Sequence, residues 1–449
     1  MKKIILAIFV ILTTIILSSC FKIATPEDLL VSPALNQEKR EMKEAVDNFR
    51  PPNSASYPVI MSDSDRSMSM IISDLDLDSS SEIISFYKSK VDDKIGMFIL
   101  KKVDNIWVKK DDIKFNTYEI SEFMIEDLNG NGKKELIVES FEPENTLNPR
   151  NYSVIYFDNK EVKVIKEIPN MIIEIADINS DGRKEIFSIT KNLSDLDYVL
   201  NIDEFDGSKI VNYRKKVLKD IKKPYNISIG KIFDEQMAIF IDYIGDNKYE
   251  NTDILLFNKN RKVLTDMRDI QEFNKGNYQF NVQSQDIDND GIIEVGYKFK
   301  APNYSMSIQD TKEGGLINGY FKIKKDYKLE LVKEVYENIN LGYVMNIPKL
   351  FTGKYTINEN DMNTNINFIN HLGKEYPLIQ INYIKKYEWQ QDNELRNSMQ
   401  LITENQDYVI AGKVLDYSDS LDDKERESYL QMRSSVQILS NVIKERLYK

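Results

Sequence analysis

The segment DINSDGRKE (177–185) lies between two apolar runs and is nearly repeated at three other places in the chain. The related segments are DLDLDSSSE (74–82), DLNGNGKKE (127–135) and DIDNDGIIE (286–294). The runs that begin at their last residues, EIISFY, ELIVES, EIFSIT and EVGYKF, are rich in the β-branched and aromatic residues of strands. We therefore predict that all four nonapeptides are loops that enter a strand, and we number their positions 1 to 9.

Oxygen-bearing side chains recur at fixed positions of these loops. Positions 1, 3 and 5 carry Asp or Asn, and position 9 carries Glu. Calcium prefers oxygen ligands, and alternate acidic residues on a tightly turned loop can converge on one point. Glycine permits the positive φ of such a turn, and position 6 is Gly132, Gly182 or Gly291, with Ser79 in the first loop. We therefore expect up to four structural Ca²⁺ ions, with the candidate ligands Asp74, Asp76, Asp78, Glu82, Asp127, Asn129, Asn131, Glu135, Asp177, Asn179, Asp181, Glu185, Asp286, Asp288, Asp290 and Glu294.

Two other kinds of loop have similar sequences. An EF-hand loop carries its bidentate Glu at position 12 and continues into a helix, whereas here Glu stands at position 9 and a strand follows. Ordinary turns rich in Asp, Asn, Gly and Ser would explain any single copy without a metal. The same acidic positions in four copies favour calcium over turn chemistry alone.

The spacing of the loops indicates a repeat. Their first residues, Asp74, Asp127, Asp177 and Asp286, are separated by 53, 50 and 109 residues. The last gap spans two periods, so a further copy is expected near residue 230, where ISIGKIFDEQMAIFIDYI (227–244) has the apolar runs without the ligand set. Hairpin signals follow at 104–105, 158–159, 206–207 and 258–259. Each period then holds about four strands, as a propeller blade does. We predict a mainly β fold: a β-propeller of about five four-stranded blades over residues 69–340.

The loops resemble those of the FG-GAP and VCBS repeats of integrin-α-type propellers, whose pattern is D-x-[DN]-x-[DN]-G-x-x-[DE]. The resemblance covers residues 69–340 and implies a calcium-binding propeller with each loop between the first two strands of a blade. It implies that positions 1, 3, 5 and 9 are ligands, and it adds the backbone carbonyl at position 7, which belongs to Ser80, Lys133, Arg183 or Ile292. Integrin-type propellers have seven blades, and their F-G and G-A-P glycine elements are not evident in this chain.

The N-terminus has the pattern of an export signal. Lys2 and Lys3 precede an uncharged apolar run (4–17), which suits a signal-peptide core and is short for a membrane span. The following LSSC (17–20) resembles the bacterial lipobox, which implies removal of residues 1–19 and acylation of Cys20, for example with palmitate. We expect a Gram-positive lipoprotein anchored by Cys20 at the extracytoplasmic face of the cell membrane, with residues 20–68 as a tether containing N-terminal helices.

Composition limits the chemistry of the chain. The 60 basic and 72 acidic residues give a net charge of −12, which argues against nucleic acid as a partner. No phosphate-binding glycine motif is present, so no nucleotide is expected. The single histidine, His371, lies in an Asn-rich segment and is expected to be an exposed loop residue, and the single cysteine is Cys20. We recognise no catalytic residues and expect no enzymatic activity.

Residues 341–449 contain no further acidic nonapeptide and are expected to form a separate C-terminal α+β domain. Ser420 with Asp423 resembles a capping box, and an apolar stripe follows at Tyr429, Met432, Val436, Leu439 and Ile443. The predicted function is that of a membrane-anchored binding or scaffold module with a protein or glycan partner at the cell surface. The alternative is a protein that binds or processes cell-envelope polysaccharide.

Overall fold

The computed structural model describes most of the chain from residue 37 onward. The described residues are 37–62, 64–142, 145, 147–158, 161–245, 248–259, 263–276, 280–301 and 315–445. The predicted signal peptide and Cys20 lie outside them. The chain forms two compact units: one comprises residues up to 59 with 66–74 and 78–115, and the other comprises 60–65, 75–77 and 116–449. None of the described helices has both the length and the apolar character needed to cross a membrane.

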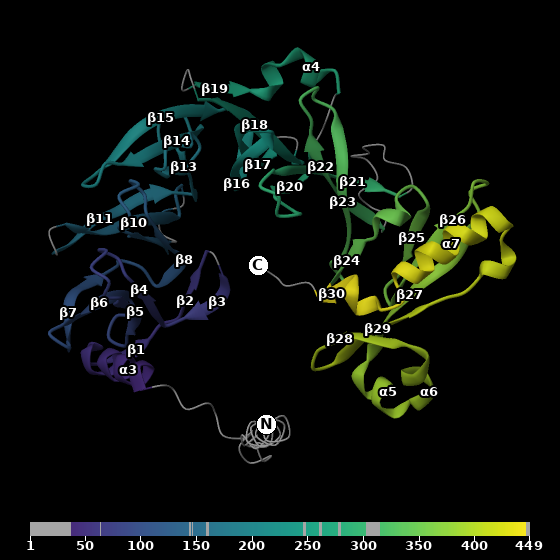
Figure 1. Cartoon of the computed structure of the whole chain (residues 1–449), viewed down its shortest axis with the longest axis horizontal. Coiled ribbons are helices and arrows are strands. Elements are labelled where there is room, and N and C mark those ends of the chain that lie inside the picture. Colours follow the sequence, from purple (N-terminus) through teal and green to yellow (C-terminus); the bar gives the residue numbers. More distant parts are fainter. Residues whose placement is uncertain are drawn as a thin grey trace, which may run out of the picture. The chain divides into compact units, whose positions relative to one another are not determined.

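The first unit is a helix packed on an antiparallel sheet (Figure 1). Helix α3 (Gln37–Phe49) buries Met42, Ala45 and Val46 in one cluster with apolar residues of the sheet, including Phe98. The sheet has the order β1-β5-β6-β7, with β4 also paired to β5. Its strands are β1 (Ser54–Ser56), β4 (Met70–Ser73), β5 (Glu82–Ser89), β6 (Ile95–Val103) and β7 (Ile106–Lys114). Residues from 37 onward are therefore part of a folded unit, which differs from the tether expected for residues 20–68.

The second unit continues with sheets whose strands follow one another along the chain (Figure 1). The second sheet contains β8 (Glu119–Glu126), β9 (Glu135–Phe141), β10 (Arg150–Asp158) and β11 (Glu161–Asn170), with β2 (Val59–Met61) parallel to β8 and β3 (Ser64–Met68) next to β2. The third contains β12 (Ile172–Ala176), β13 (Glu185–Lys191), β14 (Tyr198–Phe205) and β15 (Ile210–Leu218). The fourth contains β16 (Ile221–Phe233), β17 (Gln236–Gly245), β18 (Glu250–Asn258) and β19 (Val263–Asp266), followed by η1 (Met267–Asp269) and α4 (Gln271–Asn274).

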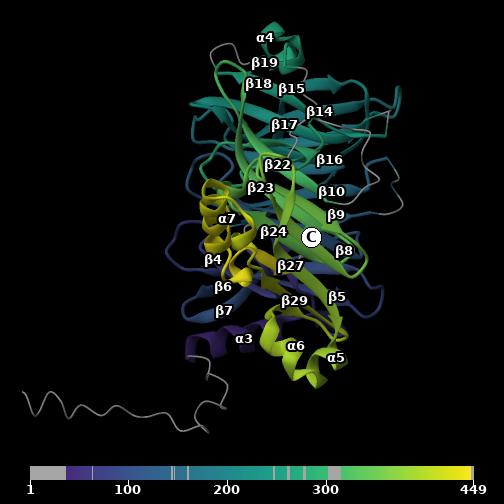
Figure 2. The ribbon, with the colours of Figure 1, turned by 90° about the vertical axis from the view of Figure 1, so that its right-hand side faces the viewer.

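Two more sheets complete the unit. The fifth has the order β20 (Val282–Gln285), β21 (Glu294–Lys300), β22 (Leu316–Ile323), β23 (Leu329–Asn338), β24 (Tyr343–Ile347) and β30 (Ile443–Glu445). The sixth has the order β25 (Tyr355–Glu359), β26 (Asn363–Ile369), β27 (Glu375–Lys385), β29 (Tyr408–Val414) and β28 (Gln400–Glu404). The remaining elements are η2 (Lys349–Phe351), α5 (Lys386–Gln391), α6 (Asn393–Ser398), η3 (Ser418–Ser420), α7 (Asp423–Ser435) and η4 (Leu439–Asn441). Figure 2 shows α5 and α6 side by side near β29.

Five consecutive sheets are built on a core of four antiparallel strands, as propeller blades are, so the prediction of a mainly β, propeller-type fold is confirmed. The second strand of the first, second, third and fifth sheets begins at the position 9 Glu of a loop. These strands are buried on both faces, which explains why their sequences are continuous apolar runs and do not alternate. The copy expected near residue 230 is the β16–β17 pair, whose connection is only Asp234 and Glu235.

The hairpin signals also lie where they were expected. β6 and β7 are joined at Asp104 and Asn105, which both have positive φ, as a tight two-residue hairpin requires. β14 and β15 are joined at 206–209, where Gly207 has φ +96°. The turns that connect β10 to β11 and β18 to β19 include residues outside the described ranges.

The boundary expected at residue 340 is not a boundary in the packing. β24 continues the fifth sheet by pairing with β23, and β30, near the end of the chain, pairs with β24. A single apolar cluster extends from Ile232 to Ile443. The region is α+β in content, as predicted, but it shares its core with the fourth and fifth sheets. The α7 N-cap is Asp422, which accepts from the Glu425 amide, and the helix ends at Ser435, so the buried Leu439 and Ile443 lie beyond it.

Candidate metal-binding loops

The four acidic loops share one turn. In each, the position 1 carboxylate accepts a hydrogen bond from the backbone amide of position 6. The donors are Ser79 (3.0 Å to Asp74), Gly132 (2.7 Å to Asp127), Gly182 (2.9 Å to Asp177) and Gly291 (2.8 Å to Asp286). Position 6 has positive φ in all four loops, which glycine adopts without strain and Ser79 does not. The first loop therefore keeps the conformation of the other three despite its missing glycine.

Positions 5 and 9 are held in the same way. The position 5 side chain accepts from the amide of position 7 at 2.7–3.0 Å in all four loops. The position 9 Glu is buried at the start of its strand, and in three loops it accepts from the amide of position 2, which belongs to Leu128 (2.9 Å), Ile178 (3.0 Å) or Ile287 (2.9 Å). Backbone amides thus pre-orient the oxygen-bearing side chains at positions 1, 5 and 9.

The donor set suits a hard cation such as calcium, because every candidate side-chain ligand is an oxygen donor. In the first and last loops, carboxylate oxygens of positions 1, 3 and 5 lie within 4.8 Å of one another. In the third loop, position 3 is Asn179, whose side chain is hydrogen-bonded to Glu185. The predicted ligands at positions 1, 3 and 5 of the first and last loops therefore lie together, as do positions 3 and 9 of the third loop.

Burial of the position 9 carboxyls affects their protonation. Desolvation raises the pKa of Glu135 and of Glu185 to about 7, with a further increase from neighbouring loop acids. Burial also raises the pKa of Glu294. Asp290 differs, because its hydrogen bond with the Lys322 ammonium lowers its pKa.

In the first and last loops, a lysine side chain from a neighbouring strand contacts the candidate ligands, and no local sequence pattern predicts it. Lys101 Nζ lies 2.8 Å from Asp78 Oδ2 and 2.9 Å from Glu82 Oε1. Lys322 Nζ lies 3.0 Å from Asp288 Oδ2 and 3.6 Å from Glu294 Oε1, and it also forms an ion pair with Asp290. Both lysines lie on the third strand of their sheet, beside the start of the second strand.

The strand register determines which residue reaches each loop. In the first sheet Ile83 pairs with Leu100, so the preceding Glu82 lies opposite Lys101. In the fifth sheet Val295 pairs with Phe321, so Glu294 lies opposite Lys322. At the same place the second sheet has Tyr156, one residue beyond the pair Leu136–Ile155. The third sheet has Glu204, which pairs directly with Glu185. The cross-strand partner of the position 9 Glu is thus a cation in two loops, a phenol in one and an acid in one.

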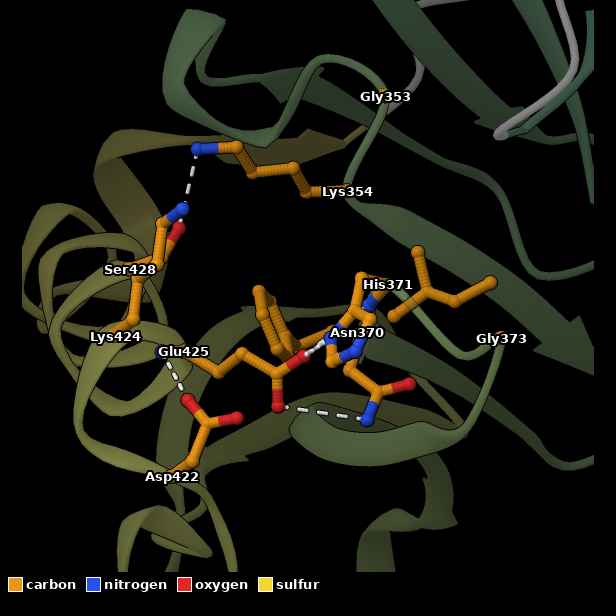
Figure 3. A pocket seen from close by; sticks show the side chains of 11 residues that line it. Gly353, Lys354, Asn370, His371, Gly373, Asp422, Lys424, Glu425 and Ser428 are labelled. Atoms are coloured by element: carbon orange, nitrogen blue, oxygen red, sulfur yellow. Dashed lines mark hydrogen bonds and ion pairs between the residues drawn. The ribbon is translucent and has the colours of Figure 1, made fainter.

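A separate pocket of about 960 Å³ lies between the β26–β27 hairpin and the first turns of α7 (Figure 3). Glu425 is hydrogen-bonded to His371 Nδ1, accepts from the His371 amide at 3.2 Å and accepts from Asn370 Nδ2 at 3.4 Å. Lys354 Nζ donates to Ser428 Oγ at 3.1 Å. His371 is 66% exposed, as expected for a loop residue, and its contacts fasten the hairpin to the helix.

No family model matches the chain, and no match was found among characterised protein sequences. Solved structures that it resembles include the β-propeller domain of the Trilobed protease from Pyrococcus furiosus, with 13% identity, 70% of this chain and 89% of that chain covered, and a TM-score of 0.31. A protein from Lactobacillus plantarum has 9% identity, coverage of 69% and 83%, and a TM-score of 0.28. A rhamnogalacturonan lyase from Bacillus licheniformis has 14% identity, coverage of 73% and 59%, and a TM-score of 0.23.

The expectation that the chain has no enzymatic activity is corrected by these comparisons, because enzymes are among the structures with a similar fold. At 14% identity or less and TM-scores of 0.20–0.23, the likeness to the lyases assigns no activity and no substrate to this chain. By the strand order of its own sheets, the chain belongs to the broad class of mainly β proteins with propeller-type sheets.

Proposed function

We propose that this protein is an FG-GAP/VCBS-type, lipid-anchored cell-surface protein whose blade-like sheets bind Ca²⁺ at their acidic loops. The observation that carries the proposal is the shared loop geometry, in which backbone amides hold the side-chain oxygens of positions 1, 5 and 9 while position 3 supplies another oxygen. When bound, the ion would supply charge neutralisation and a rigid link between the loop and its strand. Its role is structural, because it joins parts of one blade.

The calcium part is tested by titrating the metal-free mature protein with Ca²⁺ in a calorimeter. Heat of binding at millimolar or lower calcium, reduced or lost when position 1 of the second and third loops is changed (Asp127→Ala with Asp177→Ala), would support the proposal. No binding heat up to about 10 mM, well above the range of extracellular calcium modules, would refute it.

The anchor is tested separately in the producing cell. Cys20→Ala should block acylation and leave an uncleaved precursor, whereas the wild-type protein should partition with membranes as a processed form carrying lipid, detected by mass spectrometry. Processed Cys20→Ala protein in the membrane fraction would refute the lipobox interpretation.

The partner is proposed to be a protein or a glycan of the cell envelope. Incubation of the mature protein with purified cell-wall polymers, with and without calcium, separates these choices. Saturable, calcium-dependent retention on one polymer would favour the polysaccharide alternative, and retention on none would leave a protein partner as the proposal.

A further inference from the structure

We propose that Lys101 and Lys322 replace the metal ion in the first and last acidic loops, so that only the loops at Asp127 and Asp177 take up calcium. This inference rests on the proposed calcium function and deepens it, because it states which loops are metal sites. It is carried by the position of two ammonium groups relative to the predicted ligands.

Lys322 contacts the side chains of positions 3, 5 and 9 of its loop, which are three of the four side chains assigned to the metal. Lys101 contacts positions 5 and 9 of its loop. The ammonium groups are therefore already where a cation would be bound. The exposed fractions of the two side chains are only 10% for Lys101 and 20% for Lys322, so they are shielded from solvent.

A tethered ammonium is a strong competitor for a calcium ion. It is part of the same chain, so its effective concentration at the loop is far above that of an ion in solution. An entering Ca²⁺ would have to displace it from a buried Glu and leave the lysine without its carboxylate partners, which is unfavourable for a partly buried charge. The ion pair thus neutralises part of the loop charge without metal.

In the other two loops, the described residues place no ammonium group against the candidate ligand side chains. Tyr156, opposite Glu135, donates its hydroxyl hydrogen to the Ser208 carbonyl at 2.9 Å and so is turned to a different partner. Glu204, opposite Glu185, adds a negative charge. Within the described part of the chain, no lysine or arginine forms an ion pair with Asp127, Glu135, Asp177, Asp181 or Glu185.

The number of carboxylates in each loop, taken alone, predicts calcium in the first and last loops instead. The first and last loops have four carboxylates each, whereas the second has two and the third has three. If charge decided affinity, the first and last loops would bind calcium most tightly. The two hypotheses therefore predict occupation of different loops.

The test is the calcium stoichiometry of the full mature protein, measured by equilibrium dialysis with radioactive calcium. The wild-type protein should bind two ions, Lys322→Met three, and Lys101→Met with Lys322→Met four, because Met keeps the side-chain length without the charge. Lys324→Met is the matched control: Lys324 pairs with Glu330 at 2.8 Å and contacts no loop acid, so stoichiometry should stay at two.

Each other outcome decides a different point. Four ions in the wild type, unchanged by the lysine substitutions, would overturn the inference and leave the calcium function intact. No ions in the wild type but a gain in each variant would overturn calcium at the second and third loops and keep the role of the lysines. No ions in any variant would overturn both.

A second measurement uses the wild-type protein and does not depend on whether the variants fold. Acetylation of Lys101 and Lys322 in the wild-type protein is quantified by mass spectrometry with calcium and with chelator. Equal and low labelling in both conditions is expected, because calcium does not displace these ammonium groups. A several-fold rise in their labelling with calcium would overturn the inference.

Discussion

The backbone amide of Lys184 donates a hydrogen bond of 2.9 Å to the carbonyl oxygen of Leu128, which fastens position 8 of the third loop to position 2 of the second. The same contact joins Lys134 to the Leu75 carbonyl at 2.9 Å, and Ile293 donates to the Lys231 carbonyl at 2.8 Å. The loops therefore form part of the joint between consecutive sheets of the second unit. An ion that orders a loop should stabilise that joint as well as the loop itself.

The proximity of consecutive loops leads to a prediction about two glycines. Gly130 and Gly182 both have left-handed φ, +71° and +86°, but a Cβ on Gly130 would lie 2.7 Å from the Gly182 carbonyl oxygen, whereas a Cβ on Gly182 would meet nothing within 4 Å. Gly182→Ala should cost about 1–2 kcal/mol from backbone strain. Gly130→Ala should cost about 1–3 kcal/mol more because of the steric overlap. Urea unfolding of both variants measures the difference, and equal losses would contradict the loop-to-loop contact.

Outside the loops, the buried carboxylate of Asp242 should stabilise the contact between the fourth and fifth sheets. Asp242 accepts hydrogen bonds from the Ser284 amide (2.8 Å), Ser284 Oγ (2.9 Å), Thr252 Oγ1 (2.6 Å) and Asn226 Nδ2 (2.8 Å). Asp242→Ala removes the acceptor of the buried Ser284 amide and hydroxyl and should lower the free energy of unfolding by about 3 kcal/mol. The control is Glu235→Ala, 88% exposed, which should change it by less than about 0.5 kcal/mol. Similar effects of the two substitutions in urea unfolding would contradict this role of Asp242.

Stability should also depend on pH through Glu139. Burial raises the pKa of this fully buried carboxyl from 4.5 to about 7, although Arg150, 2.9 Å away, opposes the shift. Protonated Glu139 contributes to the free energy of unfolding. This contribution is fully present below pH 4.5 and is lost as the pH rises through about 7. Glu139→Gln does not ionise, so its stability relative to the wild type should increase over this range by on the order of 3 kcal/mol. Unfolding curves at pH 4.5, 6 and 8 measure this change, and a constant difference would contradict it.

The sequence was sufficient to predict the loops and their strands because both signals are local. Oxygen-bearing residues at alternate positions predicted the turn, and the buried position 9 Glu marked the start of the second strand. Lys101 and Lys322 could not be predicted in this way. The residue opposite the position 9 Glu follows it by 19, 21, 19 and 28 residues in the four sheets, because the connection to the third strand varies in length. Only the register between the second and third strands identifies the residue opposite the position 9 Glu.

The domain boundary predicted at residue 340 was wrong for a related reason. β24 pairs with β30 across about 100 residues of chain, and no local pattern indicates a pairing of that range. The change in sequence character after residue 340 reflects the end of the acidic loops and not the end of a core. The sixth sheet and α7 bury their apolar residues in the same cluster as the fifth sheet.

The most direct test of calcium binding at the second and third loops is thermal unfolding of the mature protein in 1 mM Ca²⁺ and in chelator. At about 10⁻⁴ to 10⁻³ M affinity, two sites should add about 1–3 kcal/mol, which for a chain of this length is a rise in Tm of about 1–4 °C. The variant carrying Asp127→Ala and Asp177→Ala should melt at one temperature in both conditions. A wild-type Tm that is the same with calcium and with chelator would contradict calcium binding at these loops.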